Sequence, residues 1–157
     1  MTPTNKKAFL LQDAPKLLEQ LRADTLPAFG LMTPQHMVEH LTRSIKIALK
    51  RKGEPEDPPL DRQMGFKRFI AKGAVLRHRP SDKTAADLPP LKYASLEEAI
   101  SHFPESVERF YTHFESHPEF LFYNPFMGEL DFEEIELFTF QHVRYHFWQF
   151  GLLESYP

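Results

Sequence analysis

Two histidines near the C-terminal end of the chain, His142 and His146, have the spacing of a metal-binding pair. On an α-helix, side chains four residues apart lie one turn apart on the same face, with Cβ atoms about 5–6 Å from each other. Both imidazoles could then bind one ion above that face. Two histidines do not complete a site, so the pattern predicts a metal centre only if a third ligand comes from elsewhere in the chain.

The sequence before the pair predicts the helix that would carry it. Asp131 and Glu134 form a capping-box signature, which predicts a helix beginning there and running to about Phe150. Apolar side chains earlier in this helix lie on the face that carries both histidines. We therefore expect both imidazoles to point into the protein. A buried polar group without a partner costs about 1–3 kcal/mol, and a shared metal ion would satisfy both rings.

A second predicted helix offers the third ligand. Thr33 followed by Pro34 is a strong helix start, and the helix is expected to run to about Lys52. His40 falls on its apolar inner face, and His36, one turn earlier, is a competing candidate. Three histidines from two helices leave one coordination position for water or substrate, which is typical of catalytic zinc sites. Imidazoles also bind nickel and iron, so zinc is the first expectation and these two are alternatives.

The spacing of four residues is not specific by itself. It occurs three times, in His36/His40, His113/His117 and His142/His146, among eight histidines. The His113/His117 pair runs into Pro118 at a predicted helix end, so we expect no site there. What favours the last pair is its apolar face and the inward-facing His40.

The apolar periodicity and the helix-start signals along the chain predict an all-α fold in a single domain over residues 1–157. We expect a four-helix bundle with one additional short helix and long Pro-rich loops. The predicted helices cover residues 13–24, 34–52, 61–72, a segment from Ser95 that continues through Pro104, and 131–150. Residues 53–59, 74–94 and 120–130 are predicted loops. The last of these is aromatic-rich; we expect it to pack on the bundle, with a pocket wall or a homodimer contact as alternatives.

Composition narrows the classes of function. The 157 residues contain no cysteine, which excludes disulfides, thiolate ligands and a cysteine nucleophile. No apolar stretch is long enough for a signal peptide or a membrane span, so we expect a cytoplasmic protein without a membrane partner. Net charge is −3, but residues 43–83 hold twelve Lys and Arg against five Asp and Glu. Such a stretch could face nucleic acid, although we expect it to be a solvated face or to pair with the chain's own acidic side chains.

Three segments together resemble the DinB/YfiT-like superfamily, within it a branch known only as a domain of unknown function. They are LMTPQHMVEHL (31–41), NPFMGEL (124–130) and HVRYHFWQFG (142–151). The resemblance implies a helical bundle whose metal ligands are His40, His142 and His146, while His36 falls where the pattern commonly has glutamine. The chain departs from the branch at positions that leave these ligands intact: Phe29, Leu31, Asn124, Tyr145 and Trp148.

The predicted function follows from this site. An ion with an open position could support hydrolysis, or activate the thiol of a cosubstrate, on a small molecule. Thiol-dependent transfer is an activity that the resemblance implies for the wider superfamily. Tyr145 and Gln149 lie on the histidine face and are expected to support the ligands or contact substrate. The alternative is a non-catalytic binding or stress-response module that contacts nucleic acid through residues 43–83, so whether the chain is an enzyme is left open.

Overall fold

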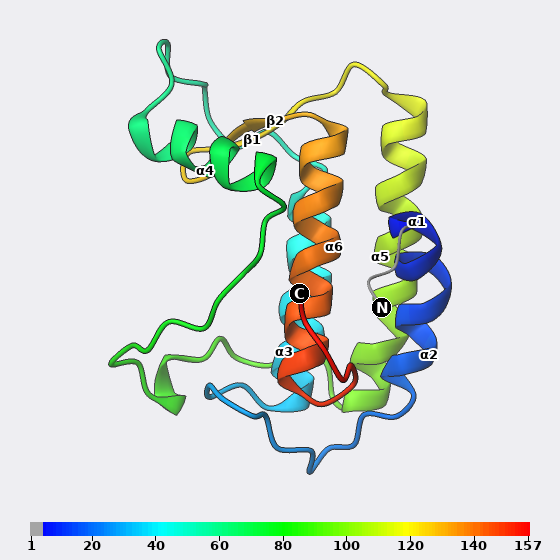
Figure 1. Cartoon of the computed structure of the whole chain (residues 1–157). Coiled ribbons are helices and arrows are strands. Elements are labelled where there is room, and N and C mark those ends of the chain that lie inside the picture. Colours follow the sequence, from blue (N-terminus) through cyan, green and yellow to red (C-terminus); the bar gives the residue numbers. More distant parts are fainter. Residues whose placement is uncertain (1–4) are drawn as a thin grey trace.

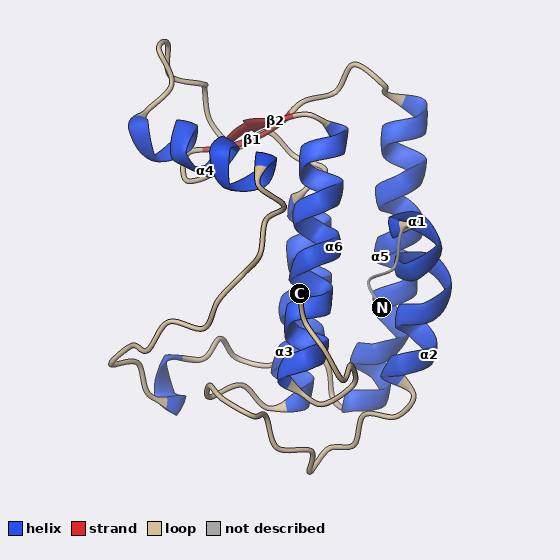
Figure 2. Ribbon diagram, viewed as in Figure 1, coloured by secondary structure: helices blue, strands red, loops and turns tan. Residues whose placement is uncertain are grey.

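The computed structural model describes residues 5–157 and is built mainly from helices (Figures 1 and 2). The long helices α3 (Pro34–Ile47), α5 (Leu96–Ser116) and α6 (Phe132–Gln149) lie side by side, and their buried apolar side chains belong to one cluster. A small two-stranded hairpin is the only sheet among the described residues. The predicted all-α class is therefore roughly right, while the four-helix bundle stays a prediction.

The N-terminal helix occupies a different segment from the predicted one. It runs without a break through α1 (Lys6–Ala8), a π-helical segment (Phe9–Asp13) and α2 (Ala14–Leu18). The prediction of a helix over residues 13–24 was wrong at both ends. Asn5 caps the helix by accepting from the Ala8 N–H at 2.9 Å. The wider π turn precedes Pro15, which has no N–H to donate and whose ring crowds the carbonyl four residues earlier.

Helix α3 begins where the sequence predicts and ends earlier. The Thr33 side chain accepts from the backbone N–H of His36 at 3.2 Å. The predicted end near Lys52 was wrong, because Arg51 forms an isolated bridge with Tyr123 of strand β1 (Phe122–Asn124). There the Lys52 N–H donates to the carbonyl of Tyr123 at 2.8 Å, so it is not available for another helical turn.

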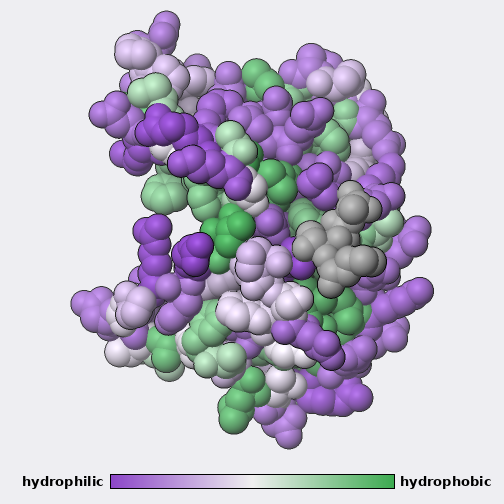
Figure 3. All heavy atoms as spheres, viewed as in Figure 1, coloured by the Kyte–Doolittle hydropathy of each residue, from purple (hydrophilic) through white to green (hydrophobic). Residues whose placement is uncertain are grey.

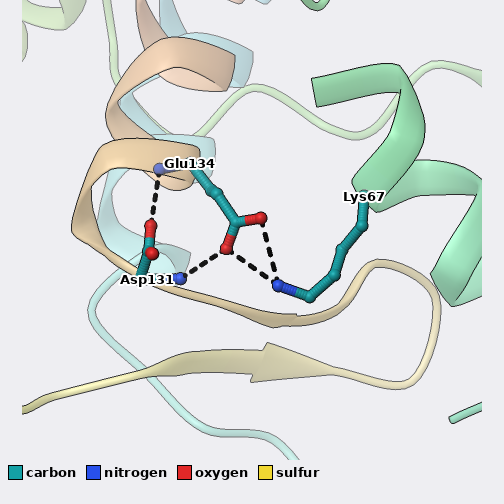
Figure 4. Close-up of polar contacts among 3 residues, drawn as sticks. All are labelled: Lys67, Asp131 and Glu134. Carbon is teal, nitrogen blue, oxygen red and sulfur yellow. Dashed lines mark hydrogen bonds and ion pairs between the residues drawn. The ribbon is translucent and has the colours of Figure 1, made fainter. Parts of the chain in front are cut away.

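Helices α4 (Asp61–Ala71) and α6 begin close to the predicted residues, and one ion pair joins them. Asp131 and Glu134 form the predicted capping box, with the two backbone-to-side-chain distances at 2.9 and 3.0 Å. The same Glu134 carboxylate binds the Lys67 ammonium of α4, at 2.9 and 3.0 Å (Figure 4). One carboxylate therefore caps α6 and holds α4 against its N-terminal end.

Helix α5 follows its prediction closely. The Ser95 side chain accepts from the Glu98 N–H at 3.1 Å, and the helix continues through Pro104 to Ser116. Its buried side chains face α3, with which it makes the most extensive helix–helix contact of the fold.

The predicted loop over residues 120–130 contains the hairpin. Strands β1 (Phe122–Asn124) and β2 (Gly128–Leu130) pair antiparallel, with Phe122 opposite Leu130. Gly128 has φ +81°, and a Cβ there would lie 2.8 Å from the Cβ of Gln63 on α4. Only glycine permits this close approach, which brings the hairpin turn against α4.

A long loop connects α4 to α5, as predicted, and contains a single 3-10 turn, Ala85–Asp87. It lies away from the long helices in its middle and returns to α3 before α5 (Figure 1). Its return is fixed by the buried Glu39 carboxylate, which accepts from the N–H groups of Lys92 and Tyr93 at 2.7 and 3.2 Å. Within residues 5–157 no helix combines the length and apolar character needed to cross a bilayer.

Candidate metal centre

Three histidines from two helices converge in the structure. His40 comes from α3, and His142 and His146 come from successive turns of α6. One ring nitrogen of each lies within 4.8 Å of those of the other two. The ring centroids form a nearly equilateral triangle with sides of 4.8, 5.0 and 4.9 Å. The structure thus brings together the three residues predicted as ligands, and together they could hold a metal ion.

The separation of His40 from His142 fits a shared ion. The Nε2 atoms of His40 and His142 are 3.0 Å apart. Two nitrogens bound at about 2.0–2.1 Å to one ion are separated by about 2.9 Å at a right angle and by about 3.3 Å at a tetrahedral angle. The observed separation falls inside this range, so an ion needs little movement of either ring.

The third imidazole is held in the tautomer that ligation requires. His146 Nδ1 lies 2.7 Å from Gln149 Oε1, and the Gln149 amide nitrogen donates to the carbonyl of Phe29 at 2.8 Å. Because the amide nitrogen faces that carbonyl, its oxygen must face the ring and accept a proton from Nδ1. Nε2 of His146 is then left with a lone pair for an ion, so the contact that Gln149 makes is that of a residue positioning a ligand.

The loop before α3 fixes Gln149 in place. The Ala28 N–H donates to the backbone carbonyl of Gln149 at 2.8 Å. Gly30 has φ +85°, and a Cβ there would lie 2.8 Å from the Gln149 amide nitrogen. Sequence reasoning missed the role of Phe29 and Gly30, because a backbone carbonyl carries no residue signature. The one available signal was a glycine at the end of a loop that leads into the His40 helix.

Burial keeps the three rings neutral. Desolvation, with smaller contributions from His146 and Arg43, lowers the pKa of His40 to about 3. Burial also holds the pKa of His142 well below its usual range, followed by the effects of His146 and His40. The pKa of His146 is lowered by burial and partly restored by its bond to Gln149. Neutral imidazoles are the form that binds a metal ion.

A cavity of about 300 Å³ opens beside the histidines, between α3, α6 and the hairpin. His40 and His142 line it, so a fourth ligand could approach from this side. Its remaining walls are mostly apolar, and the polar side chains among them are Ser44, Asn124 and Thr139. The expected packing of the 120–130 segment on the helices is confirmed, since Phe122 and Leu130 belong to the buried core. Phe122, Asn124 and Met127 also form a wall of the cavity.

Aromatic side chains cover the opposite end of the site. The Tyr145 ring lies against His146, with centroids 5.0 Å apart, and Phe29 packs on Tyr145 and Trp148 at 5.7 and 5.6 Å. No hydrogen bond of the Tyr145 hydroxyl occurs within residues 5–157. Tyr145 therefore contacts a predicted ligand by packing, whereas Gln149 contacts it by a hydrogen bond.

The other candidate side chains of α3 have different partners. His36 turns toward the start of its helix, where Nδ1 lies 2.7 Å from the Thr33 hydroxyl, so it does not join the three. Glu39, the neighbour of His40 in sequence, does not face outward: its carboxylate is buried and holds the loop before α5. Desolvation alone would raise the pKa of Glu39, but hydrogen bonds from Lys92, Gln35 and Tyr93 and the effect of His36 together lower it.

The basic stretch is engaged in part with the chain's own carboxylates. Arg51 binds Glu129 at 2.9 Å, and Lys67 binds Glu134 at 2.9 Å. Two of its cations thus pair internally, as expected for a stretch that offsets acidic side chains.

Comparison with protein families, with characterised proteins and with solved structures finds no match to this chain. The site must therefore be interpreted from its own geometry.

Proposed function

We propose that the chain is a DinB/YfiT-like four-helix-bundle metalloprotein. In this proposal His40, His142 and His146 hold one divalent transition-metal ion, zinc before nickel or iron. The site acts on a small molecule, by hydrolysis or by transfer that depends on a thiol cosubstrate. The helices that support the bundle assignment are the N-terminal one together with α3, α5 and α6.

The observation that carries the proposal is the position of the three imidazoles relative to the cavity. They are neutral, they come from two helices, and two of them line a space of about 300 Å³. A structural zinc site closes four protein ligands around the ion, whereas only three converge here within the described residues. The side facing the cavity is where a water, a thiol or a substrate atom would bind.

The chain's own residues limit the chemistry. An ion in this site would supply Lewis acidity to whatever occupies its open position. No carboxylate of the described residues lines the cavity, so no Asp or Glu is placed there as a general base. The chain has no cysteine, so a thiol nucleophile must arrive with a cosubstrate. Ser44, Asn124 and Thr139 are the side chains available to hydrogen-bond and orient a substrate.

The proposal is tested with two surrogate reactions on the same preparation. Hydrolysis is followed with p-nitrophenyl acetate, and thiol transfer with 2-mercaptoethanol and 1-chloro-2,4-dinitrobenzene. We expect at least one rate to depend on zinc, to fall to the background of free zinc in His142→Ala, and to persist in His113→Ala. Equal rates with and without metal, or in wild type and His142→Ala, would contradict the proposal.

A further inference from the structure

A second, larger cavity of about 600 Å³ lies under α4, between that helix, the loop that follows it and the hairpin turn. Figure 3 shows the surface indented in this region, with hydrophobic and hydrophilic side chains on its rim. Nothing in the proposed metal chemistry accounts for this cavity. Its lining combines three arginines with three aromatic rings: Arg62, Arg77, Arg79, Phe66, Phe69 and Phe126.

The charged side chains that line the cavity are all positive. No acidic side chain lines it, and within residues 5–157 none of the three arginines pairs with a carboxylate. One nitrogen of Arg62 donates to the carbonyl of Pro125 at 3.1 Å, which leaves its other N–H groups available. Guanidinium groups bind planar anions such as carboxylates through paired hydrogen bonds. Three of them around one hollow favour an anionic ligand.

The apolar part of the cavity indicates the rest of the ligand. Phe126, which lines the cavity, is 70% exposed. Phe66 and Phe69 pack against each other with centroids 5.7 Å apart. Exposed aromatic surface beside unpaired cations is suited to a flat apolar body that carries an anionic group.

Two walls of the cavity, α4 and the hairpin turn, are held together before any ligand binds. Gln63 and Arg62 both donate to the Pro125 carbonyl, at 2.9 and 3.1 Å, and so hold the hairpin turn against α4. The ion pair of Lys67 with Glu134 holds α4 against α6 (Figure 4). A preformed cavity loses less entropy on binding than a flexible surface does.

Aromatic contacts connect this cavity to the histidines. Phe66, which lines it, packs on Phe138 at 5.5 Å between centroids, and Phe138 stacks on His142 at 5.2 Å. In the hairpin turn, Phe126 faces the arginine cavity while its neighbour Met127 lines the histidine cavity. The two cavities therefore share a wall.

We propose that the arginine cavity binds the anionic end of a small molecule with an aromatic or similarly flat apolar body. The anion is a carboxylate or a group of the same charge, such as a sulfonate or phosphate ester. The inference goes beyond the proposed function and does not depend on it, because the arginine cavity and the histidine cavity share no lining residue.

The test is calorimetric titration with 2-naphthoate, at low salt, on protein freed of metal with a chelator. Its uncharged analogue 2-naphthamide serves as the ligand control. Arg77→Gln combined with Arg79→Gln is compared with Lys72→Gln combined with Lys83→Gln. The second pair removes the same charge from exposed residues of the same region that do not line the cavity. All four positions are exposed, and unchanged melting temperatures check that both variants fold.

We expect naphthoate to bind wild type and the lysine variant at least about tenfold more tightly than it binds the arginine variant, and more tightly than naphthamide binds. Equal affinity for the acid and the amide, or equal affinity of the two variants, would overturn the proposal. Binding that appears only with zinc and survives in the arginine variant would place the anion on the metal and also overturn it. Binding without metal in His142→Ala protein keeps the inference standing even if the proposed metal function fails.

Discussion

The pairs His142/His146 and His113/His117 have the same spacing and different surroundings. The first lies on the inner face of α6, where His40 of α3 completes a triangle of rings. In the second, His117 stands at the C-terminal end of α5, and its Nδ1 lies 3.0 Å from the carbonyl of His113. The neighbours of His113 are the aromatic rings of Phe114 and Phe120 rather than a third ligand.

The difference shows that a pair of histidines with this spacing does not by itself make a metal site. Spacing on a helix aims two side chains at one point, but an ion needs further ligands and neutral rings in a fixed orientation. At the first pair, a second helix supplies His40, burial keeps the rings neutral, and Gln149 fixes one tautomer. At the second pair, no third histidine, Asp or Glu joins the two rings within the described residues.

The largest effect should come from removing one histidine of each pair. Loss of a residue that only orients a ligand weakens metal binding by about 10–100-fold. We expect His142→Ala to weaken zinc binding by more than this, because a direct ligand is lost. His113→Ala should leave zinc affinity unchanged. Competition titration with a chromophoric chelator measures both, and equal losses in the two variants would remove the distinction between the pairs.

The next effect concerns the residue that orients His146. Gln149→Leu should weaken zinc binding by about 10–100-fold, because the Nδ1 proton loses its acceptor and the tautomer is no longer fixed. Gln141→Leu is the matched control, since Gln141 lies on the same helix and also bonds a loop carbonyl, that of Gly73 at 2.9 Å. Both variants should lose stability, and only the first should lose zinc affinity; a loss in both would make the effect structural.

Acid should destabilise the metal-free protein through the buried rings. Below the ordinary pKa of about 6.5, the unfolded chain takes up protons that His40, with its pKa lowered to about 3, does not take up when folded. Stability is therefore fully present above that pKa and falls as pH decreases toward 3. Between pH 7 and 5.5 we expect a loss of about 1 kcal/mol for each ring that stays neutral.

Urea unfolding in the presence of a chelator measures this loss. Replacing His40, His142 and His146 with Gln should remove most of it, and His113→Gln should remove less, because only one titrating ring is lost. A pH dependence unchanged in the triple variant would show that these rings are not kept neutral by folding.

The smallest effect tests the loop that holds Gln149. Gly30→Ala and Gly151→Ala both place a side chain at positive φ, +85° and +76°, which costs about 1 kcal/mol of stability. Only at Gly30 does the new Cβ meet the Gln149 amide, at 2.8 Å; at Gly151 nothing lies within 4 Å. Thermal melts should show similar losses, while zinc affinity should fall a few-fold in Gly30→Ala alone. Equal affinities would mean that the loop does not support the site.

Local signals explain which parts of this molecule could be predicted. The Asp131–Glu134 capping box and the Thr33–Pro34 start act within a few residues, so they placed the two helices that carry the histidines. The end of α3 depends on a competing partner far along the chain, so its limit was missed. The backbone groups of Lys50 and Lys52 form hydrogen bonds with Tyr123 of strand β1, although the sequence pattern predicts a helix there.

Within the site, too, features set by local sequence could be predicted and those set by distant partners could not. The faces of the two helices predict that the histidines point inward, because helical periodicity alone determines a face. The contact between Gln149 and the Phe29 carbonyl joins positions 120 residues apart, and no spacing rule reaches that far. Burial of Glu39 likewise follows from where the loop before α5 returns, which the sequence of α3 does not contain.

The most direct test of the central claim is a crystal structure of the zinc-loaded protein with anomalous data at the zinc edge. We predict one anomalous peak per chain, about 2.0–2.1 Å from a ring nitrogen of each of His40, His142 and His146, with a fourth ligand on the side of the histidine cavity. Zinc-soaked crystals with no peak among the three rings, and with His40 still hydrogen-bonded to His142, would contradict the account.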